Sequence, residues 1–528
     1  MKKSCNYFIS NILFAKDLSR NLRRFYPADE RLVRKKTVEI LLKSSIGIGL
    51  AVLLLFIFMD FRLYYLVLVG VLGNSIYKVV VLKNIARIEL KLLSQLENFM
   101  SELRFSYQGN SSLEDAYLDA MGNAEYEMNL QGELLFQYCL GKEINEKNEY
   151  ADLAPNSFFL MLYILCQSNY IYGDQISNEG SHFLINLTSL KEQITEEILR
   201  RKKSNALFSG LEEVSLAALF AIRPIEYWAV SNLEDLTVYY NSRTGRISTI
   251  IIYTLTFLVF YLIQFFHYED SYKKEGNSCI CKISNIDTIS YYLIQIINHQ
   301  RNYVKLIYKN LLMTDSPYSC KEFLCKQIIY VVAGTFIGFI LFGINIAGLI
   351  LGILCGVAPL VKLLFLKEWM KQKYEEEVVR FQTVILILKN IDGMSVETIF
   401  EWMCKTAFIF REGMESILGR VGFMGNRLIN ELEEEMNYPP FSKLLKGFLA
   451  CDRLPICQVF EYLEVDKRYY LQKQKQEKEL WLSDTVSLGK VIAYIPMFLV
   501  VIFKLILPFV IEGLSQLSFY SEGISSII

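Results

Sequence analysis

The stretch SSIGIGLAVLLLFIFMDFRLYYLVLVGVLGNSIY at residues 44–77 decides the fold class. It consists of two apolar runs, 44–59 and 63–77, interrupted by Asp60 and Arg62. Apolar runs of this kind, joined by a short charged turn, need a lipid solvent to cover them. The stretch therefore predicts a transmembrane hairpin.

The same order of segments then occurs a second time. A charged, helix-patterned block follows the first hairpin to about Asn205, and hydrophobic sequence follows that block. From residue 327 an uncharged stretch of 35 residues runs to Val361, before a charged block to about Asp484 and an apolar end. One straight helix across ~30 Å of hydrocarbon needs ~20 residues, so 327–361 predicts two passes that turn near Asn345. Duplication at this period predicts an architecture of two related lobes.

Composition narrows the class of protein. Hydrophobic residues make up 52% of the chain, and the net charge of −1 excludes a chain-wide basic surface for nucleic acid. The eleven scattered cysteines form no disulfide framework and fit a reducing compartment for the charged blocks. Residues 1–40 carry ten Lys/Arg against four Asp/Glu with no leading apolar segment, so we expect no secretory signal peptide.

The positions of the basic residues predict the topology. The N-terminal arm is basic, block one ends in Arg200–Lys203, and block two is flanked by lysines, so we expect all three in the cytoplasm. Both blocks lie on one side only if residues 207–230 also cross the membrane, despite Glu212, Glu213, Arg223 and Glu226. The alternative is that 207–230 lies flat at the interface. We predict seven passes, with the N-terminus inside and the C-terminus outside.

Apolar residues at helical spacing predict that both blocks are helical bundles. The stripes are Leu92, Leu93, Leu96, Phe99, Met100 and Leu103 in block one, and Val378, Val379, Phe381, Val384, Ile385 and Leu388 in block two. Each stripe ends at a glycine, followed by serines that predict the N-cap of a second helix: Gly109 with Ser111/Ser112, and Gly393 with Ser395. In block one, a long helix is expected over 175–203; in block two, the comparable helix is 456–482.

We therefore predict an all-α polytopic membrane protein with two cytoplasmic helical bundles related as an internal repeat. The expected domains are a basic arm (1–43), a transmembrane hairpin (44–82), helical domain 1 (83–205), a transmembrane pair (206–266), a cytoplasmic linker (267–326), a transmembrane hairpin (327–366), helical domain 2 (367–487), a final transmembrane helix (488–511) and an external tail (512–528).

Two stretches, LLSQLENFMSELRFSYQGNSSLEDAYLDAM (92–121) and VVRFQTVILILKNIDGMSVETIFEWM (378–403), resemble the opening helix, glycine turn and second helix of the type II secretion system F-domain proteins. RRKKSNALFSGLEEVSLAALFAIRPIEYW (200–228) with TGRIS (244–248) looks like the exit of the B-type protein of tight-adherence pili. YIPMFLVVIFKLILPFV (494–510) looks like the last crossing of the C-type partner. The similarity spans about 40–270 and 327–511, as in a fusion of the two partners. The linker 267–326 and the stretch 141–157 have no counterpart in the family pattern.

The resemblance implies an inner-membrane platform of a bacterial secretion or pilus machine. Its implied partners are a cytoplasmic hexameric secretion ATPase, pilin or pseudopilin subunits, the lipid bilayer and further copies of the same chain, with no nucleic acid. The chain lacks a G-x-x-x-x-G-K-[ST] phosphate loop, so the energy would come from a partner. We expect no enzyme activity, no catalytic residue, no cofactor and no metal.

Lys504 is the sharpest candidate for a functional contact, because an ammonium within an apolar crossing is costly and usually faces a partner. We expect it to pair with Glu212, with Glu213 or with a membrane-buried glutamate that the pilin family carries. The alternative is that its side chain reaches the outer interface. The glycine turns at Gly109 and Gly393 are further partner-contact candidates by family analogy.

Other clusters favour ordinary structural roles. Four linker cysteines (Cys279, Cys281, Cys320, Cys325) have zinc-ligand chemistry without a common zinc spacing. Three dispersed histidines (His182, His267, His299) suggest no catalytic dyad. The acidic clusters 375–377 and 431–435 either face a basic partner or, as charge runs usually do, form solvated helix faces.

A multipass transporter with duplicated halves is the main alternative function, because repeats and intramembrane charges also mark transporters. Helices with paired Gly/Pro interruptions are not evident in the sequence, which favours the platform. A membrane-bound enzyme is a third alternative, and no motif supports it.

Overall fold

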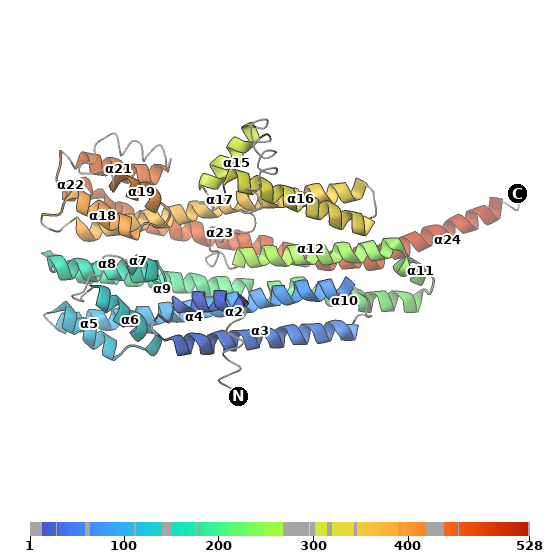
Figure 1. Cartoon of the computed structure of the whole chain (residues 1–528), viewed down its shortest axis with the longest axis horizontal. Helices are drawn as coiled ribbons and strands as arrows, with labels where there is room; N and C mark the ends of the chain where they lie inside the picture. The colour runs from blue at the N-terminus through green and yellow to red at the C-terminus, as the bar shows by residue number, and fades with distance from the viewer. Residues whose placement is uncertain are drawn as a thin grey trace. The chain divides into compact units, whose positions relative to one another are not determined.

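A computed structural model gives the fold of the chain (Figure 1). The structure describes residues 13–27, 29–58, 64–109, 112–139, 150–177, 180–267, 295, 301–313, 319–342, 346–389, 391, 393–418, 438–451 and 453–525. Within these ranges the fold is all-α apart from one antiparallel pair of two-residue strands, which confirms the all-α part of the predicted fold class.

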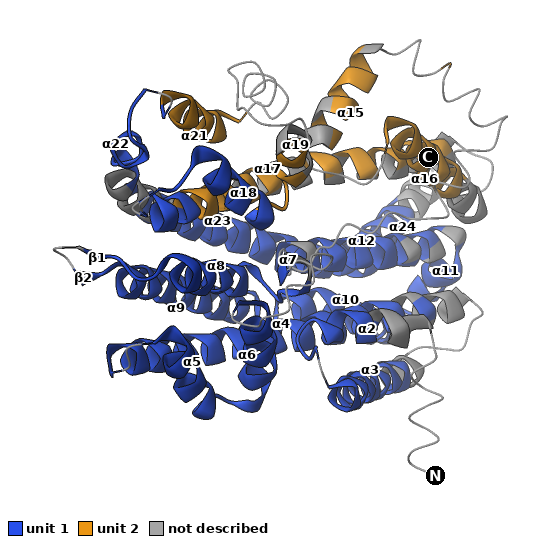
Figure 2. Ribbon diagram, turned by 60° about the vertical axis from the view of Figure 1, so that its left-hand side comes forward, with its two compact units in different colours: residues 1–271, 383–406, 451–528 blue, residues 272–382, 407–450 orange. Residues whose placement is uncertain are grey.

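The chain divides into two compact units, coloured separately in Figure 2. Unit 1 comprises residues 1–271, 383–406 and 451–528, and unit 2 comprises residues 272–382 and 407–450. The described helices of unit 2 are α15 (Arg301–Met313), α16 (Cys320–Phe342), α17 (Ile346–Leu388, as far as residue 382), α19 (Arg411–Leu418) and α21 (Pro439–Ala450).

Unit 1 contains the remaining described elements. They are α2 (Leu13–Arg23), α3 (Glu30–Phe58), α4 (Tyr64–Gly109), α5 (Leu113–Gly122), α6 (Tyr126–Cys139), α7 (Tyr150–Leu153), α8 (Ser157–Tyr172), β1 (Ile176–Ser177), β2 (Gly180–Ser181), α9 (His182–Phe208), α10 (Leu211–Asn232), α11 (Leu236–Asn241), α12 (Arg243–His267), α18 (Val396–Thr406), α22 (Ile456–Val459), α23 (Tyr462–Val501), the π-turn η2 (Ile502–Ile506) and α24 (Leu507–Ser525).

The predicted stripe of block one forms the core of a helical bundle. All six of its residues in α4 are buried; α5, α6 and α9 pack against α4, and α8 packs against those three helices. Ser112 caps α5 by accepting a hydrogen bond from the backbone N–H of Asp115 at 3.1 Å, which confirms the predicted N-cap. In block two, Ser395 accepts from the backbone N–H of Thr398 at 3.1 Å, so the second predicted cap is also confirmed.

The long helix of block one begins later than predicted. Residues 176–177 and 180–181 form the strand pair, in which Gly180 has a φ of +113°, a conformation that favours glycine. Ser181 then caps α9, so this helix starts at His182 instead of residue 175. The Asp174 carboxylate fixes this entry, because it accepts hydrogen bonds from the Ser181 hydroxyl (2.5 Å), the Phe183 N–H (3.1 Å) and the Tyr107 hydroxyl (3.3 Å).

Three described helical segments are long and apolar enough to cross a membrane: 182–232, 247–264 and 475–517. The first contains the predicted crossing 207–230, of which residues 211–230 lie in α10. The turns predicted near Asp60 and Asn345 lie outside the described residues, although helices end and begin on either side of both. These segments identify a membrane protein at the level of composition and length.

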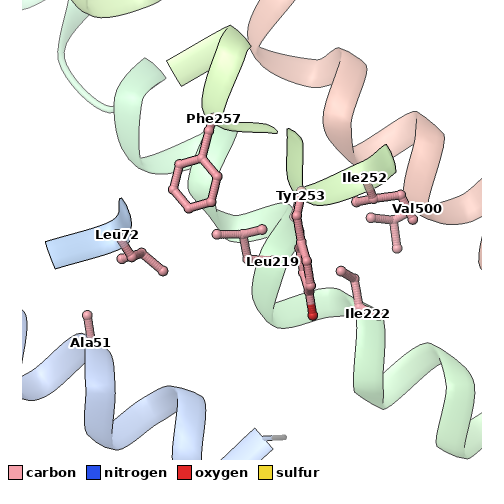
Figure 3. Close-up of a cluster of buried hydrophobic side chains, with 9 residues drawn as sticks. Ala51, Leu72, Leu219, Ile222, Ile252, Tyr253, Phe257 and Val500 are labelled. Atoms are coloured by element: carbon pink, nitrogen blue, oxygen red, sulfur yellow. The ribbon is translucent and has the colours of Figure 1, made fainter. Parts of the chain in front are cut away.

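The apolar helices of unit 1 share a hydrophobic cluster, shown in Figure 3. Its buried residues come from α3, α4, α10, α12 and α23, and they are Ala51, Leu72, Ala218, Leu219, Ile222, Ile252, Tyr253, Phe257 and Val500. The cluster thus joins the first predicted hairpin, the predicted transmembrane pair and the final helix into one bundle.

Candidate functional site: a polar cluster among apolar helices

A lysine occupies the interior of this apolar bundle. Lys504 lies in η2, and its side chain is 1% exposed. Its Nζ donates to the carboxylate Oε1 of Glu226 on α10 at 2.7 Å. It also donates to Thr249 Oγ1 at 2.6 Å and to the carbonyl oxygen of Gly245 at 3.1 Å, both on α12. Since an ammonium has three donors, these three acceptors satisfy it completely.

Sequence features explain why the acceptors meet there. Gly245 lies in the first turn of α12, and a Cβ at this position would collide with the backbone of Tyr239 and Tyr240 in α11. Glycine therefore allows α11 to fold tightly back against α12. Tyr240 is placed by the same turn, and its hydroxyl donates to the backbone carbonyl of Lys504 at 2.6 Å. The ammonium lies 5.6 Å from the centre of the Tyr240 ring, within the range of a cation–π contact.

A second cation lies beside the pair. Arg223 Nη1 is 3.5 Å from Glu226 Oε2, one helical turn away on α10. Glu226 thus faces two cations, one at each carboxylate oxygen. Loss of Glu226 would leave the buried ammonium of Lys504 without its counter-charge, at a cost of about 3–5 kcal/mol, whereas loss of Lys504 would still leave Glu226 next to Arg223.

The structure corrects the predicted partner of Lys504. Glu212 lies instead at the start of α10, where its Oε1 is 3.1 Å from Nδ1 of His267 at the end of α12. Glu213 is exposed. The predicted contact with a glutamate of a pilin stays a prediction, and the alternative of an ammonium at a polar interface does not match a side chain that is 1% exposed.

A smaller polar group lies at the opposite end of α10. Nε2 of His267 is 3.1 Å from the side-chain oxygen of Asn205, while its ring stacks on Phe208 with 5.1 Å between centroids. Gly210, with a φ of +84°, separates α9 from α10 at this point. The group joins the ends of α9, α10 and α12.

The remaining candidates are dispersed. Gly109 is the last residue of α4, and Gly393 has a φ of +79°, so Gly393 fits its predicted role as a structural break. His182 begins α9, whereas His299, Cys279 and Cys281 lie outside the described residues. Within the described part of the chain, no group of three or more His, Cys, Asp or Glu residues could hold a metal ion.

One acidic residue differs from the expected solvated face. Glu377, in α17 of unit 2, is 0% exposed. Its carboxylate accepts hydrogen bonds from the backbone N–H groups of Phe408 (2.7 Å), Ile409 (2.9 Å) and Phe410 (3.3 Å). Glu377 therefore holds the turn before α19, and the cluster 431–435 lies outside the described residues.

Comparisons with known proteins return no match: no family model, no curated protein and no solved structure matches the chain.

Proposed function

We propose that this chain is an inner-membrane platform protein of a type II secretion or tight-adherence pilus machine. In this role it anchors pilin subunits and couples them to a cytoplasmic hexameric secretion ATPase. We further propose seven passes, a cytoplasmic N-terminus, an external C-terminus, and helical lobes that descend from an internal repeat. The proposal rests on the resemblance to the F-domain family, and one feature of unit 1 supports the coupling role.

That feature is the continuity of α23. Its 40 residues extend about 60 Å, from a charged half to an apolar half. The charged half is ion-paired with α9 of the first lobe, through Lys475–Glu196 at 2.9 Å and Lys203–Glu479 at 3.7 Å. The apolar half packs between α10 and α12. One unbroken helix thus connects the helical lobe to the lipid-facing bundle, as a mechanical coupler requires.

The first test is genetic. Deletion of the gene should abolish surface filaments, and its neighbours should encode a secretion ATPase, small pilins and a prepilin peptidase. Normal filaments after deletion would refute the platform. Lys504→Ala should also abolish filaments with the protein still present in the membrane.

The second test addresses the coupling helix. Gln476 is exposed on α23 next to the Lys475–Glu196 pair. Gln476→Pro removes a helical hydrogen bond and costs about 3 kcal/mol in a helix interior, so it should kink α23. We expect filaments to be lost at unchanged protein level, whereas Gln476→Ala should assemble normally. Equal filament numbers in both variants would contradict mechanical coupling through α23.

A transporter remains the second candidate, because the charged cluster around Lys504 lies among helices apolar enough to cross a membrane. Under this alternative, Glu226→Gln would abolish uptake of a solute and leave filaments unchanged. The two phenotypes separate the candidates.

A further inference from the structure

The last helix changes its hydrogen-bonding pattern at Lys504. The backbone N–H of Leu507 bonds to the carbonyl of Ile502, five residues earlier, instead of four as in an α-helix. Residue 508 is a proline, which has no N–H and whose ring clashes with the carbonyl of the residue four positions before it. That residue is Lys504. The π-turn therefore follows from Pro508.

Pro508 leaves the carbonyl of Lys504 without its helical donor. The Tyr240 hydroxyl takes the place of the missing N–H, at 2.6 Å. The side chain of the same lysine is bound to Glu226 and to two atoms of α12. The backbone carbonyl of Lys504 thus binds α11, and its side chain binds α10 and α12. Both contacts are made at the π-turn, where the hydrogen bonding of the last helix is interrupted.

Beyond this point the helix has fewer lateral contacts. Phe509 still lies near Trp228 of α10, with 6.4 Å between ring centroids. Past it, the apolar side chains of Val510, Ile511, Leu514 and Leu517 are all exposed. α24 also packs against α11, the helix that carries Tyr240. Helices bend at prolines and at π-turns, so α24 can change direction at residues 502–508 unless this packing and the contacts of Lys504 prevent it.

We propose that residues 502–508 form a hinge in the last helix, and that Glu226 and Tyr240 latch it by binding the side chain and the backbone carbonyl of Lys504. With the latch closed, α24 keeps one direction relative to α10. With either contact removed, α24 adopts further directions. The hinge is independent of the proposed platform function, because its test measures the geometry of the isolated protein.

The experiment measures a distance across the hinge in the full chain, reconstituted in lipid nanodiscs. Spin labels are placed on the exposed residues Ser231 of α10 and Ser515 of α24 through a noncanonical amino acid, which leaves the eleven native cysteines unlabelled. The labelled chain with an intact latch should give one narrow distance distribution. Glu226→Gln and Tyr240→Phe should each add a second population.

Two controls make the result decisive. Glu213→Gln removes an exposed carboxylate from the same helix and should keep the single narrow distribution. A second label pair on exposed residues of the first lobe, Glu114 and Glu192, should be unchanged in every variant, which shows that the lobe stays folded. Tyr240→Phe removes one hydroxyl group and decides the matter if Glu226→Gln perturbs the lobe. The proposal would be overturned if Tyr240→Phe kept the single narrow distance distribution. It would also be overturned if the chain with an intact latch gave a distance distribution as broad as that of the variants.

Discussion

At the scale of a residue, Glu377 shows how a buried carboxylate can stabilise a turn. Its buried carboxylate is the acceptor for three successive backbone N–H groups at residues 408–410. Glu377→Ala would leave these donors, of which the Phe410 N–H is buried and the other two are part-buried, without their acceptor, at a cost of about 3 kcal/mol. We expect a lower melting temperature of the purified chain and faster tryptic cleavage after Arg411. Glu377→Gln, which retains an acceptor oxygen, should lose less, and Glu401→Ala on the exposed face of α18 should be neutral.

The cysteines of unit 1 should differ sharply in reactivity. Cys166 is fully buried in α8, and burial raises the pKa of its thiol to about 12, so almost no thiolate forms near pH 8. Cys457 is exposed. Iodoacetamide at pH 8 should therefore label Cys457 in the native protein and reach Cys166 only after unfolding, as mass spectrometry of the peptides would show. Rapid native labelling of Cys166 would contradict the described packing of α8.

The pairing of Lys504 illustrates what the sequence could have shown at residue scale. Hydropathy located the lysine but not its partner: Glu212 and Glu213 at the start of α10 were the predicted partners, whereas the structure pairs Lys504 with Glu226. Glu212 and Glu226 are about 21 Å apart along α10. With the predicted topology, Glu212 lies near the cytoplasmic end of its crossing, whereas Lys504 and Glu226 both lie near the outer end. Comparing how deep each charged residue lies along its predicted crossing would have indicated Glu226 as the partner of Lys504. Glu377 carried no such signal, since its backbone partners lie more than thirty residues away and any residue type supplies an N–H.

At the scale of elements, helical periodicity and serine caps located α4, α5 and α18 well, because both signals are local. Several of the expected domain boundaries, in contrast, do not coincide with the ends of helices. Residues 82/83, 205/206, 366/367 and 487/488 all fall inside single helices, namely α4, α9, α17 and α23. Composition marks where the surroundings of a helix change, and a helix has no need to end there. The start of α9 was missed because a strand pair as short as β1–β2 leaves no periodic pattern.

The pairing of α16 with α17 in unit 2 depends on two glycines one turn apart. A Cβ on Gly352 would collide with Thr335, and one on Gly356 would collide with Val331. Small residues let helices approach closely in a membrane, where packing replaces the hydrophobic driving force. Gly352→Val should therefore lower the melting temperature of the chain in detergent. Gly70→Val, at a position in α4 with no atom within 4 Å of the added Cβ, is the matched control. Equal melting temperatures would indicate that the two helices do not pack closely in the native protein.

At the scale of the whole molecule, the proposal requires that both charged blocks face the same compartment. Basic residues flank each block, while the short loop after α10 contains Glu234 and Asp235, and the residues after Ile511 carry no Lys or Arg. Since loops rich in Lys and Arg remain in the cytoplasm, reporters inserted near residues 130 and 430 should both report cytoplasm. A reporter after Glu234 and one at the C-terminus should report the outside.

This topology depends on whether α10 crosses the membrane. If α10 lay flat at the interface, the number of crossings between the two blocks would be odd. The reporters at 130 and 430 would then face opposite compartments, and no single cytoplasmic ATPase could engage both blocks.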